Sequence, residues 1–215
     1  MEDVLDVYAM PPDEKRPVVC LDEFCKQLLS EWRAPLPARP SGDNEQKGTR
    51  LRQDAEYIRE GSASGFMICA PKLGRREIYI SETATRTAID YAHAVRFLCD
   101  DMFPEAEKIV VIQDNLNTHT PASLYKAFPP DEARRLAKRI EWHFTPKHGS
   151  WLNIAEIEIS VLSRSSLKGR IPNVEAFRKL AKDDSKRRNE SSRPVKWLFT
   201  TTDARIKLRR LYPAI

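Results

Sequence analysis

The sequence lacks any uninterrupted run of about eighteen apolar residues, the length that a membrane-crossing helix needs. Its first ten residues, MEDVLDVYAM, contain acids and lack the basic start and apolar stretch of a secretory signal, so we expect a cytoplasmic protein. The chain has 215 residues, of which 41% are hydrophobic and 31% charged. This balance is typical of one globular domain, or of one domain with an appendage.

Cysteine and glycine are scarce. The four cysteines form no CxxC pair, and the four histidines show no zinc-ligand spacing relative to them. We therefore expect reduced, mostly buried thiols and no structural zinc. With only seven glycines, the chain contains no glycine-rich phosphate loop, and it shows no Ser/His/Asp nucleophile set. These absences leave carboxylate chemistry as the main candidate.

Acidic charge is scarce at the C-terminal end. From Val174 onward there are 12 Lys and Arg against 5 Asp and Glu, a surplus of 7, whereas the rest of the chain has 24 against 26. Such a basic end indicates contact with a polyanion, although a solvated helix face would have the same composition. The candidate contacts are Lys186, Arg187, Arg188, Arg205, Lys207, Arg209 and Arg210.

Apolar periodicity predicts a mixed α/β order along the chain. The predicted strands are 17–23, 66–70, 77–81, 108–114 and 140–145, with 66–70 and 77–81 joined as a hairpin. The predicted helices are 83–102, 120–128, 131–139, 153–163, 174–188 and 203–211. Segment 33–64 is rich in Pro, Gly, Ser and charge, which predicts a long loop or a poorly ordered insertion.

Two of the predicted strands end in acids, Asp22 and Asp114. In an open α/β sheet, ligands gather beyond the strand ends, so acids placed there face a common crevice. Asp is also a frequent turn former, which gives either residue alone a structural reading. A third acid lies on the helix after TPKHGSWLN. Three carboxylates on separate elements can hold two metal ions about 3.5–4 Å apart for an in-line displacement at phosphorus.

Four stretches carry a resemblance to a known family: VVCLDE, IVVIQDNLNTHTPASLYKAFPPDEARRL, WHFTPKHGSWLNIAEIEISVLSR and FTTTDARIKLRRLYP. They resemble the DDE domain of bacterial insertion-sequence transposases, the prokaryotic branch of the mariner superfamily. The resemblance covers nearly the whole chain and is weakest from Phe24 to Arg76. It implies a ribonuclease-H-like α/β fold, with a mixed central sheet flanked by helices and a basic helical C-terminal extension.

The resemblance also implies an activity and partners. The activity is metal-dependent DNA strand cleavage and strand transfer with two Mg²⁺ or Mn²⁺ ions. The partners are double-stranded DNA, as element ends and target, and further copies of the chain in a homodimer or higher synaptic assembly. Such a protein would be associated with the nucleoid. Family members usually carry an N-terminal helix-turn-helix region, whereas this chain begins almost at the catalytic domain. Three explanations stay open: the downstream half of a split reading frame with a separate helix-turn-helix part, a truncated copy, or an excised domain.

Carried over residue by residue, the resemblance implies that Asp22, Asp114 and Glu156 are the catalytic, metal-binding acids. Glu156 follows the LN pair as LNxxE. Asn115 and His119 match the Asn and His that follow the second Asp, and would support the site or touch substrate. Their structural alternatives are an Asx turn for Asn115 and packing at a helix start for His119.

The third acid has a rival, Glu158, on the same helix. A helical wheel places Glu158 inside an apolar stripe formed by Ile154, Ile157, Val161 and Leu162, and Glu156 on the opposite side. Asn153 and Glu156 also match a capping box, a purely structural device. The position after LN favours Glu156, and Glu158 stays as the alternate third ligand.

The segment before this helix is a candidate substrate contact. Lys147, His148 and Ser150 carry donors that could meet a phosphate at the N-terminus of the helix, although ordinary loop solvation explains them equally well.

We expect three parts: an N-terminal lead-in (1–16), a ribonuclease-H-like DDE catalytic domain (17–172) and a basic helical C-terminal extension (173–215). Two other functions fit the same residues. One is a stand-alone nuclease of this fold, which cuts strands without joining them. The other is an inactive or truncated transposase remnant that only binds DNA. The latter draws on the first motif, in which the acidic pair is followed by Phe24 and not by the family's usual Lys.

Overall fold

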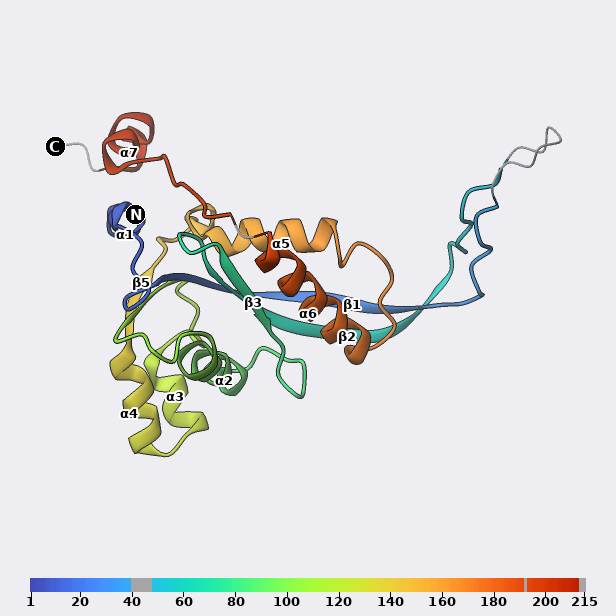
Figure 1. Ribbon diagram of the computed structural model, residues 1–215, viewed down its shortest axis with the longest axis horizontal. Helices are drawn as coiled ribbons and strands as arrows, with labels where there is room; N and C mark the ends of the chain where they lie inside the picture. Colours follow the sequence, from blue (N-terminus) through green and yellow to red (C-terminus); the bar gives the residue numbers. More distant parts are fainter. Residues whose placement is uncertain (40–47, 192, 213–215) are drawn as a thin grey trace.

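The computed structural model describes residues 1–39, 48–191 and 193–212. Its strands are β1 (Val18–Glu31), β2 (Tyr57–Ala70), β3 (Arg75–Tyr79), β4 (Ile109–Gln113) and β5 (Ile140–Phe144). Its α-helices are α1 (Glu2–Ala9), α2 (Ala88–Phe97), α3 (Pro121–Ala127), α4 (Pro130–Arg139), α5 (Ile154–Arg164), α6 (Val174–Glu190) and α7 (Thr201–Lys207) (Figure 1). A π-helical turn (Leu98–Met102) extends α2, and short 3₁₀ turns form at Ser150–Leu152 and Arg209–Leu211.

Within the described residues, the strands form one five-stranded sheet in the order β3-β2-β1-β4-β5. β1, β2 and β3 pair antiparallel as a meander, whereas β4 and β5 run parallel to β1. The parallel strands need crossover connections, and helices supply them. This mixed sheet with flanking helices confirms the predicted ribonuclease-H-like α/β fold.

Both faces of the sheet are buried, because the side chains of each central strand alternate between two hydrophobic clusters. On β1, Val18 and Cys20 face one cluster, and Val19 and Leu21 face the other. Helices α1, α5 and α6 contribute to the first cluster, and α2, α3 and α4 to the second (Figure 1). The start of β1 therefore lies at the centre of the molecule, and this fixes the position of the residues that follow it on the strand.

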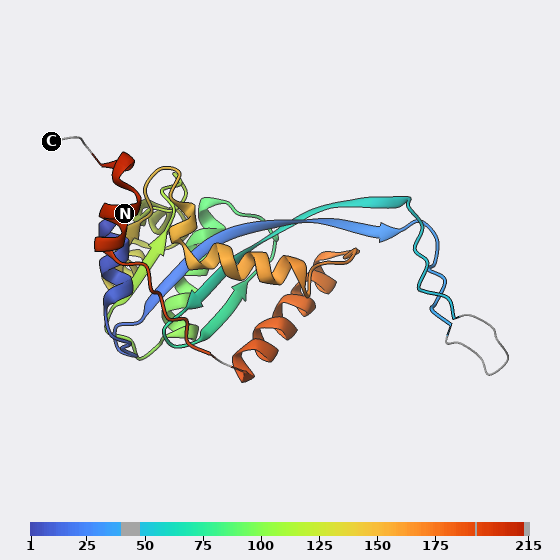
Figure 2. The same cartoon turned by 90° about the horizontal axis from the view of Figure 1, so that it is seen from above.

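Segment 33–64 differs from its prediction. β1 continues to Glu31 and β2 begins at Tyr57, so the two strands pair antiparallel well beyond the body of the protein. The bridges Leu36↔Arg52 and Arg39↔Thr49 continue this arm (Figure 2). The predicted loop is therefore wrong over 57–64, and residues 40–47 lie outside the described residues. The start of β2 was missed because its first six side chains are exposed, and the end of β1 because its buried, half-buried and exposed side chains follow no regular apolar alternation.

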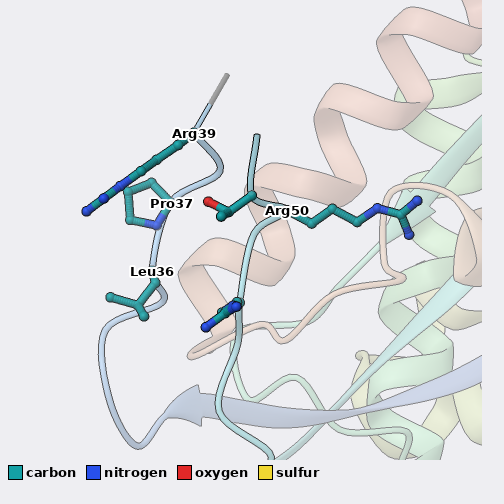
Figure 3. Close-up of a pocket in the computed structure, with 6 residues that line it drawn as sticks. Leu36, Pro37, Arg39 and Arg50 are labelled. Atoms are coloured by element: carbon teal, nitrogen blue, oxygen red, sulfur yellow. The ribbon is translucent and has the colours of Figure 1, made fainter. Parts of the chain in front are cut away.

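The outer part of the arm is narrow and basic. Leu36, Pro37 and Arg39 on one side and Thr49, Arg50 and Arg52 on the other line a pocket of about 220 Å³ (Figure 3).

The first residues form a helix that the sequence pattern did not predict. α1 buries Val4, Leu5, Val7 and Tyr8, which recur at helical spacing, against the first hydrophobic cluster. It lies beside α7, because the Glu2 carboxylate accepts two hydrogen bonds from Arg205 (2.7 Å each) (Figure 1). The two ends of the described chain therefore meet on one side of the sheet. No described helix has the length and apolar character that crossing a membrane requires.

Candidate active site

Asp22 and Asp114 lie side by side because of strand register. The last pair between the parallel strands β1 and β4 is Cys20↔Ile112, and each Asp lies two residues beyond it. β4 ends just before Asp114, as predicted, whereas β1 continues past Asp22. Asp22 is therefore an acid within a strand and not at its end. The parallel register, and not the strand end, brings the two carboxylates to the same place.

The Asp22 carboxylate is buried and held by two donors. Its Oδ1 accepts from the backbone N–H of Glu23 (2.9 Å), and its Oδ2 accepts from Asn153 Nδ2 (3.2 Å). The same Asn153 nitrogen donates to Leu21 O (3.0 Å), and its Oδ1 caps α5 by accepting from Ala155 N (3.2 Å). The start of α5 is thus tied directly to the first acid.

Negative charge concentrates around Asp22. Burial raises the pKa of its carboxyl to about 7, and the nearby carboxylates of Asp114 and Glu156 add to the rise, against the lowering effect of His119. A carboxylate with this pKa is one whose negative charge lacks full compensation in the protein alone. A cation beside Asp22 would offset both the burial and the neighbouring negative charges.

His119 joins two acids from different elements. Its Nδ1 lies 2.5 Å from Asp114 Oδ1 and its Nε2 lies 3.0 Å from Glu23 Oε2, while its fully buried ring stacks on Tyr91 (centroids 4.7 Å apart). Burial alone would lower the pKa of His119, but the hydrogen bonds to Asp114 and Glu23 raise it to about 9. The imidazolium form therefore predominates at neutral pH, donates to both carboxylates and fixes Asp114.

Glu156 and Glu158 point to different surroundings. Glu158 is 6% exposed, and its Oε2 lies 2.6 Å from Arg188 and 3.3 Å from Arg76. Glu156 is exposed in the first turn of α5, and its charge acts on Asp22. The structure thus places Glu156, and not Glu158, with the two Asp residues.

The apolar stripe predicted for α5 is wrong in two of its members. Ile157 and Val161 are 53% and 36% exposed, and the buried side of α5 consists of Ile154, Ala155, Glu158 and Leu162. A helical wheel that counts only apolar residues missed this rotation, because the two arginines compensate the charge of Glu158 and allow it to be buried.

A groove of about 410 Å³ begins at Asp114 and runs along the loop before α5. It is lined by Asp114, Asn115, Leu116, Thr145, Pro146, Lys147, His148 and Ser150. Four of the five predicted substrate contacts therefore lie together beside the second acid. The fifth, His119, is fully buried and does not line the groove.

The loop that forms this groove has a tight turn. His148 adopts a left-handed backbone conformation (φ 62°), and a Cβ on Gly149 would lie 2.6 Å from Pro146 Cγ. Only glycine fits at position 149 without a shift of the loop. The turn thus sets the course of Lys147, His148 and Ser150 past Asp114.

The seven basic residues predicted to contact a polyanion are divided between two places. Lys186, Arg187 and Arg188 are on α6, and the other four are on or just after α7, which lies beside α1 and apart from α6 (Figures 1 and 2). Arg188 turns inward to Glu158 and Arg205 pairs with Glu2, whereas Lys186, Arg209 and Arg210 are exposed. The seven therefore do not form one surface.

The three acids have the chemistry to bind a divalent cation, but their side chains lie too far apart to share one in this structure. In the described part of the chain, no three His, Cys, Asp or Glu side chains lie close enough together to hold a metal ion as they stand. Asp22, Asp114 and Glu156 provide hard carboxylate oxygens around the raised pKa of Asp22, which is the donor set that Mg²⁺ prefers. Glu156 is the exposed member of the three.

Two supporting residues were not singled out from the sequence. Glu23 accepts from both His119 and Arg86 (2.8 Å to Arg86), and Asn153 links α5 to Asp22. Period-two alternation places Glu23 on the face of the sheet opposite to Asp22, towards α2 and α3, which is a signal that could have identified it. Nothing in the sequence pattern marks the bond from Asn153 to Asp22.

Comparisons with known proteins identify a family for most of the chain. The family model of the DDE superfamily endonuclease matches residues 17–178. No curated protein matches the chain.

Among solved structures, the chain is similar to the Mos1 strand transfer complex (14% identity, 81% of this chain and 53% of that chain, TM-score 0.31). It is also similar to the Mos1 mariner paired end complex with Mn (14% identity, 86% and 57%, TM-score 0.35). A third is the Mos1 transposase paired-end complex with left transposon end (16% identity, 81% and 54%, TM-score 0.29). The chain spans little more than half the length of these solved chains.

Proposed function

The chain belongs to the DDE superfamily endonuclease family, and we propose that it is the catalytic domain of a transposase that cleaves DNA strands and joins them to target DNA. The observation that carries this proposal is the pairing of Asp22 and Asp114 by parallel register, with the charge of Glu156 acting on Asp22. Three carboxylates from separate elements are the type of ligand set that holds a metal pair for phosphodiester chemistry.

We propose that Asp22, Asp114 and Glu156 hold two Mg²⁺ or Mn²⁺ ions. When bound, such a metal pair neutralises charge on the attacking and leaving oxygens of an in-line displacement at phosphorus. The protein supplies the positions of the ligands. His119 holds the Asp114 carboxylate from one side, and Asn153 holds the Asp22 carboxylate from α5.

The proposed reaction has two steps. In the first, water attacks a phosphodiester at the element end, the bond from phosphorus to the 3′ oxygen breaks, and a 3′-hydroxyl and a 5′-phosphate are left. In the second, that 3′-hydroxyl attacks a phosphodiester of the target, a new bond to phosphorus forms, and a target 3′-hydroxyl leaves. Both steps are displacements at phosphorus, so one set of acids serves both.

The groove beside Asp114 is where we place the DNA strand. Lys147 and His148 can donate to phosphate oxygens, and Asn115 and Ser150 can donate to phosphate or sugar. Exposed Lys186, Arg209 and Arg210 would add contacts with the duplex backbone outside the groove. Joining two element ends would further need at least two copies of the chain, in a homodimer or a larger synaptic assembly.

The test of this function is a strand-cleavage and strand-transfer assay. The purified chain is incubated with a labelled duplex carrying a 3′-hydroxyl and with supercoiled plasmid, in Mg²⁺, in Mn²⁺ or in EDTA. Asp114→Asn is compared with Asp131→Asn, which removes an exposed acid at the start of α4. We expect metal-dependent nicking and joined product in the wild type and in Asp131→Asn, and neither in Asp114→Asn.

The possible outcomes separate the rival functions. Nicking without joined product would identify a stand-alone nuclease. DNA binding without nicking in either metal would identify a non-catalytic remnant. Wild-type cleavage by Asp114→Asn, with an unchanged requirement for metal, would contradict the proposed site.

A further inference from the structure

The hydroxyl of Tyr8 lies at the junction between α1 and the start of α5. Tyr8 Oη donates to Leu152 O (2.6 Å), and it accepts from the backbone N–H of Ile154 (3.3 Å). Leu152 and Ile154 are the two neighbours of Asn153, the residue that holds Asp22. One side chain from the N-terminal helix thus bridges both flanks of a residue in the active site, across more than 140 positions of sequence.

This bridge gives the first N–H of α5 an oxygen acceptor, in addition to the nearby Cys20 sulfur. Ile154 is the first residue of α5, and the first N–H groups of a helix have no acceptor within the helix. A hydroxyl has one proton to donate and two lone pairs. Tyr8 gives its proton to Leu152 O, so the Cys20 thiol (3.2 Å) and Ile154 N–H are its donors.

Asn153 connects this bridge to two of the proposed ligands, Asp22 and Glu156. Its side chain donates to Asp22 Oδ2 and to Leu21 O, and its carbonyl accepts from Glu156 N (3.1 Å). A shift of the backbone at Asn153 would therefore move the donor to Asp22 and the origin of Glu156 together. Asn153 is 1% exposed, so no water can readily replace these contacts.

The Tyr8 ring is fixed from two sides. Val4 and Val7 hold α1 in the hydrophobic cluster, and the ring stacks on Trp197 with 4.7 Å between centroids. Tyr8 itself is 5% exposed. The hydroxyl therefore has little freedom to move, and its hydrogen bonds restrict its two backbone partners, Leu152 O and Ile154 N, in the same way.

We propose that Tyr8 is a positioning residue of the active site. Its hydroxyl bridges Leu152 O and Ile154 N, and this bridge holds Asn153 against Asp22. The same bridge keeps Glu156 within reach of both Asp residues. This inference rests on the proposed function. It makes the N-terminal helix part of the catalytic apparatus and not an addition that only protects the core.

The test uses Tyr8→Phe in the full chain, which removes the hydroxyl and keeps the ring that stacks on Trp197. We expect kcat for strand cleavage to fall roughly tenfold to a hundredfold, since small displacements of catalytic groups have such effects. Affinity for the DNA duplex should stay unchanged, because Tyr8 does not line the groove. Mn²⁺ affinity, measured by titration without DNA, should weaken about tenfold, as for other residues that orient metal ligands.

Two control variants separate positioning from stability. Tyr125→Phe removes the hydroxyl of an exposed tyrosine on α3 (51% exposed) and should change nothing. Trp197→Leu removes one of the two supports of the Tyr8 ring but keeps the hydroxyl, so it should lower the melting temperature while kcat and Mn²⁺ affinity fall less than in Tyr8→Phe. If Tyr8→Phe and Trp197→Leu share one phenotype of lowered melting temperature with unchanged kcat, Tyr8 has only a packing role and the inference is overturned.

Hydrogen exchange gives a readout that does not depend on activity. In Tyr8→Phe the Ile154 amide loses its oxygen acceptor and keeps only the Cys20 sulfur, which is a weak one. We expect this amide to exchange severalfold faster while amides in the core of β4 keep their rates. Unchanged exchange at Ile154 overturns the inference. If the wild type neither cleaves DNA nor binds Mn²⁺, the proposed function fails, and the exchange rate alone then decides whether Tyr8 holds the start of α5.

Discussion

Replacing Glu158 with glutamine removes the negative charge that two buried arginines share. The side chains of Arg76 and Arg188 are 9% and 18% exposed, and both approach Glu158 Oε2. In Glu158→Gln, Asp184, which lies 3.8 Å from Arg188, still compensates one of the two arginines. Breaking a buried ion pair by removing one partner costs about 3–5 kcal/mol. We expect roughly 3 kcal/mol here, the low end of that range, because the amide oxygen still accepts a hydrogen bond.

The matched variant is Glu156→Gln, two residues earlier on the same helix. Glu156 is exposed, so its substitution should change the free energy of unfolding by no more than about 0.5 kcal/mol. Removing its charge also relieves repulsion with Asp22 in the metal-free protein, so a small gain is expected. We therefore expect the two variants to have opposite effects on stability and on cleavage. Glu158→Gln loses stability and keeps metal-dependent cleavage, whereas Glu156→Gln keeps stability and loses cleavage.

The assay is urea unfolding of the metal-free protein together with DNA nicking in Mg²⁺ at a temperature where each variant is folded. For a domain of this size, about 3 kcal/mol corresponds to a melting temperature lowered by roughly 6–12 °C. If Glu158→Gln is as stable as wild type, the buried charge network is not what holds α5. If Glu158→Gln loses cleavage while Glu156→Gln retains it, the third ligand is Glu158 and the assignment is wrong.

Three further predictions concern charge. Because the pKa of Asp22 is raised to about 7, the folded metal-free protein binds more protons than the unfolded chain between about pH 4 and 7, so its stability falls as pH rises through that window. Asp22→Asn should flatten this fall in thermal melts, and an unchanged profile would refute the raised pKa. Because the pKa of His119 is raised to about 9, its contribution to the free energy of unfolding is full below about pH 6.5 and is lost towards pH 9. His119→Gln should remove this second fall in stability. A wild-type profile above pH 7 in that variant would count against the bridge to Asp114 and Glu23. Replacing Arg209 and Arg210 with Gln should reduce the slope of log K against log salt for duplex DNA by about 1.8, that is about 0.9 for each phosphate that the protein no longer neutralises, and an unchanged slope would show that these residues are only solvated.

Most of the fold could be predicted from local pattern. The buried strand β4, the half-buried strand β5 and the helices from α2 to α6 follow apolar periodicity. Pro121 and Pro130 at the first turns of α3 and α4 mark where those helices begin. The long arm could not be predicted, because its strands have exposed side chains and depend on pairing of their backbones with each other. α1 was missed for a different reason. Its apolar residues have helical spacing, but the acids among them indicate only that the segment is not a secretory signal.

The acids of the candidate site were identified with different degrees of support from the sequence. Asp22 and Asp114 follow from two apolar strands, although their proximity depends on parallel register, which no local pattern specifies. The choice between Glu156 and Glu158 rested on the LNxxE motif, and periodicity alone favoured the wrong buried stripe. Arg76, which holds Glu158 on the other side of α5, is 82 positions away in sequence, so only the folded structure reveals it.

The central claim is that Asp22, Asp114 and Glu156 together hold two divalent metal ions. The most direct measurement is a crystal structure of the chain soaked in Mn²⁺, with the metal located by anomalous scattering. We predict two peaks about 3.5–4 Å apart, with Asp22 and Asp114 at manganese-ligand distance and the Glu156 side chain rotated towards them. Peaks that leave Asp22 and Asp114 without metal contacts, or no peak between these carboxylates at saturating Mn²⁺, would contradict the account.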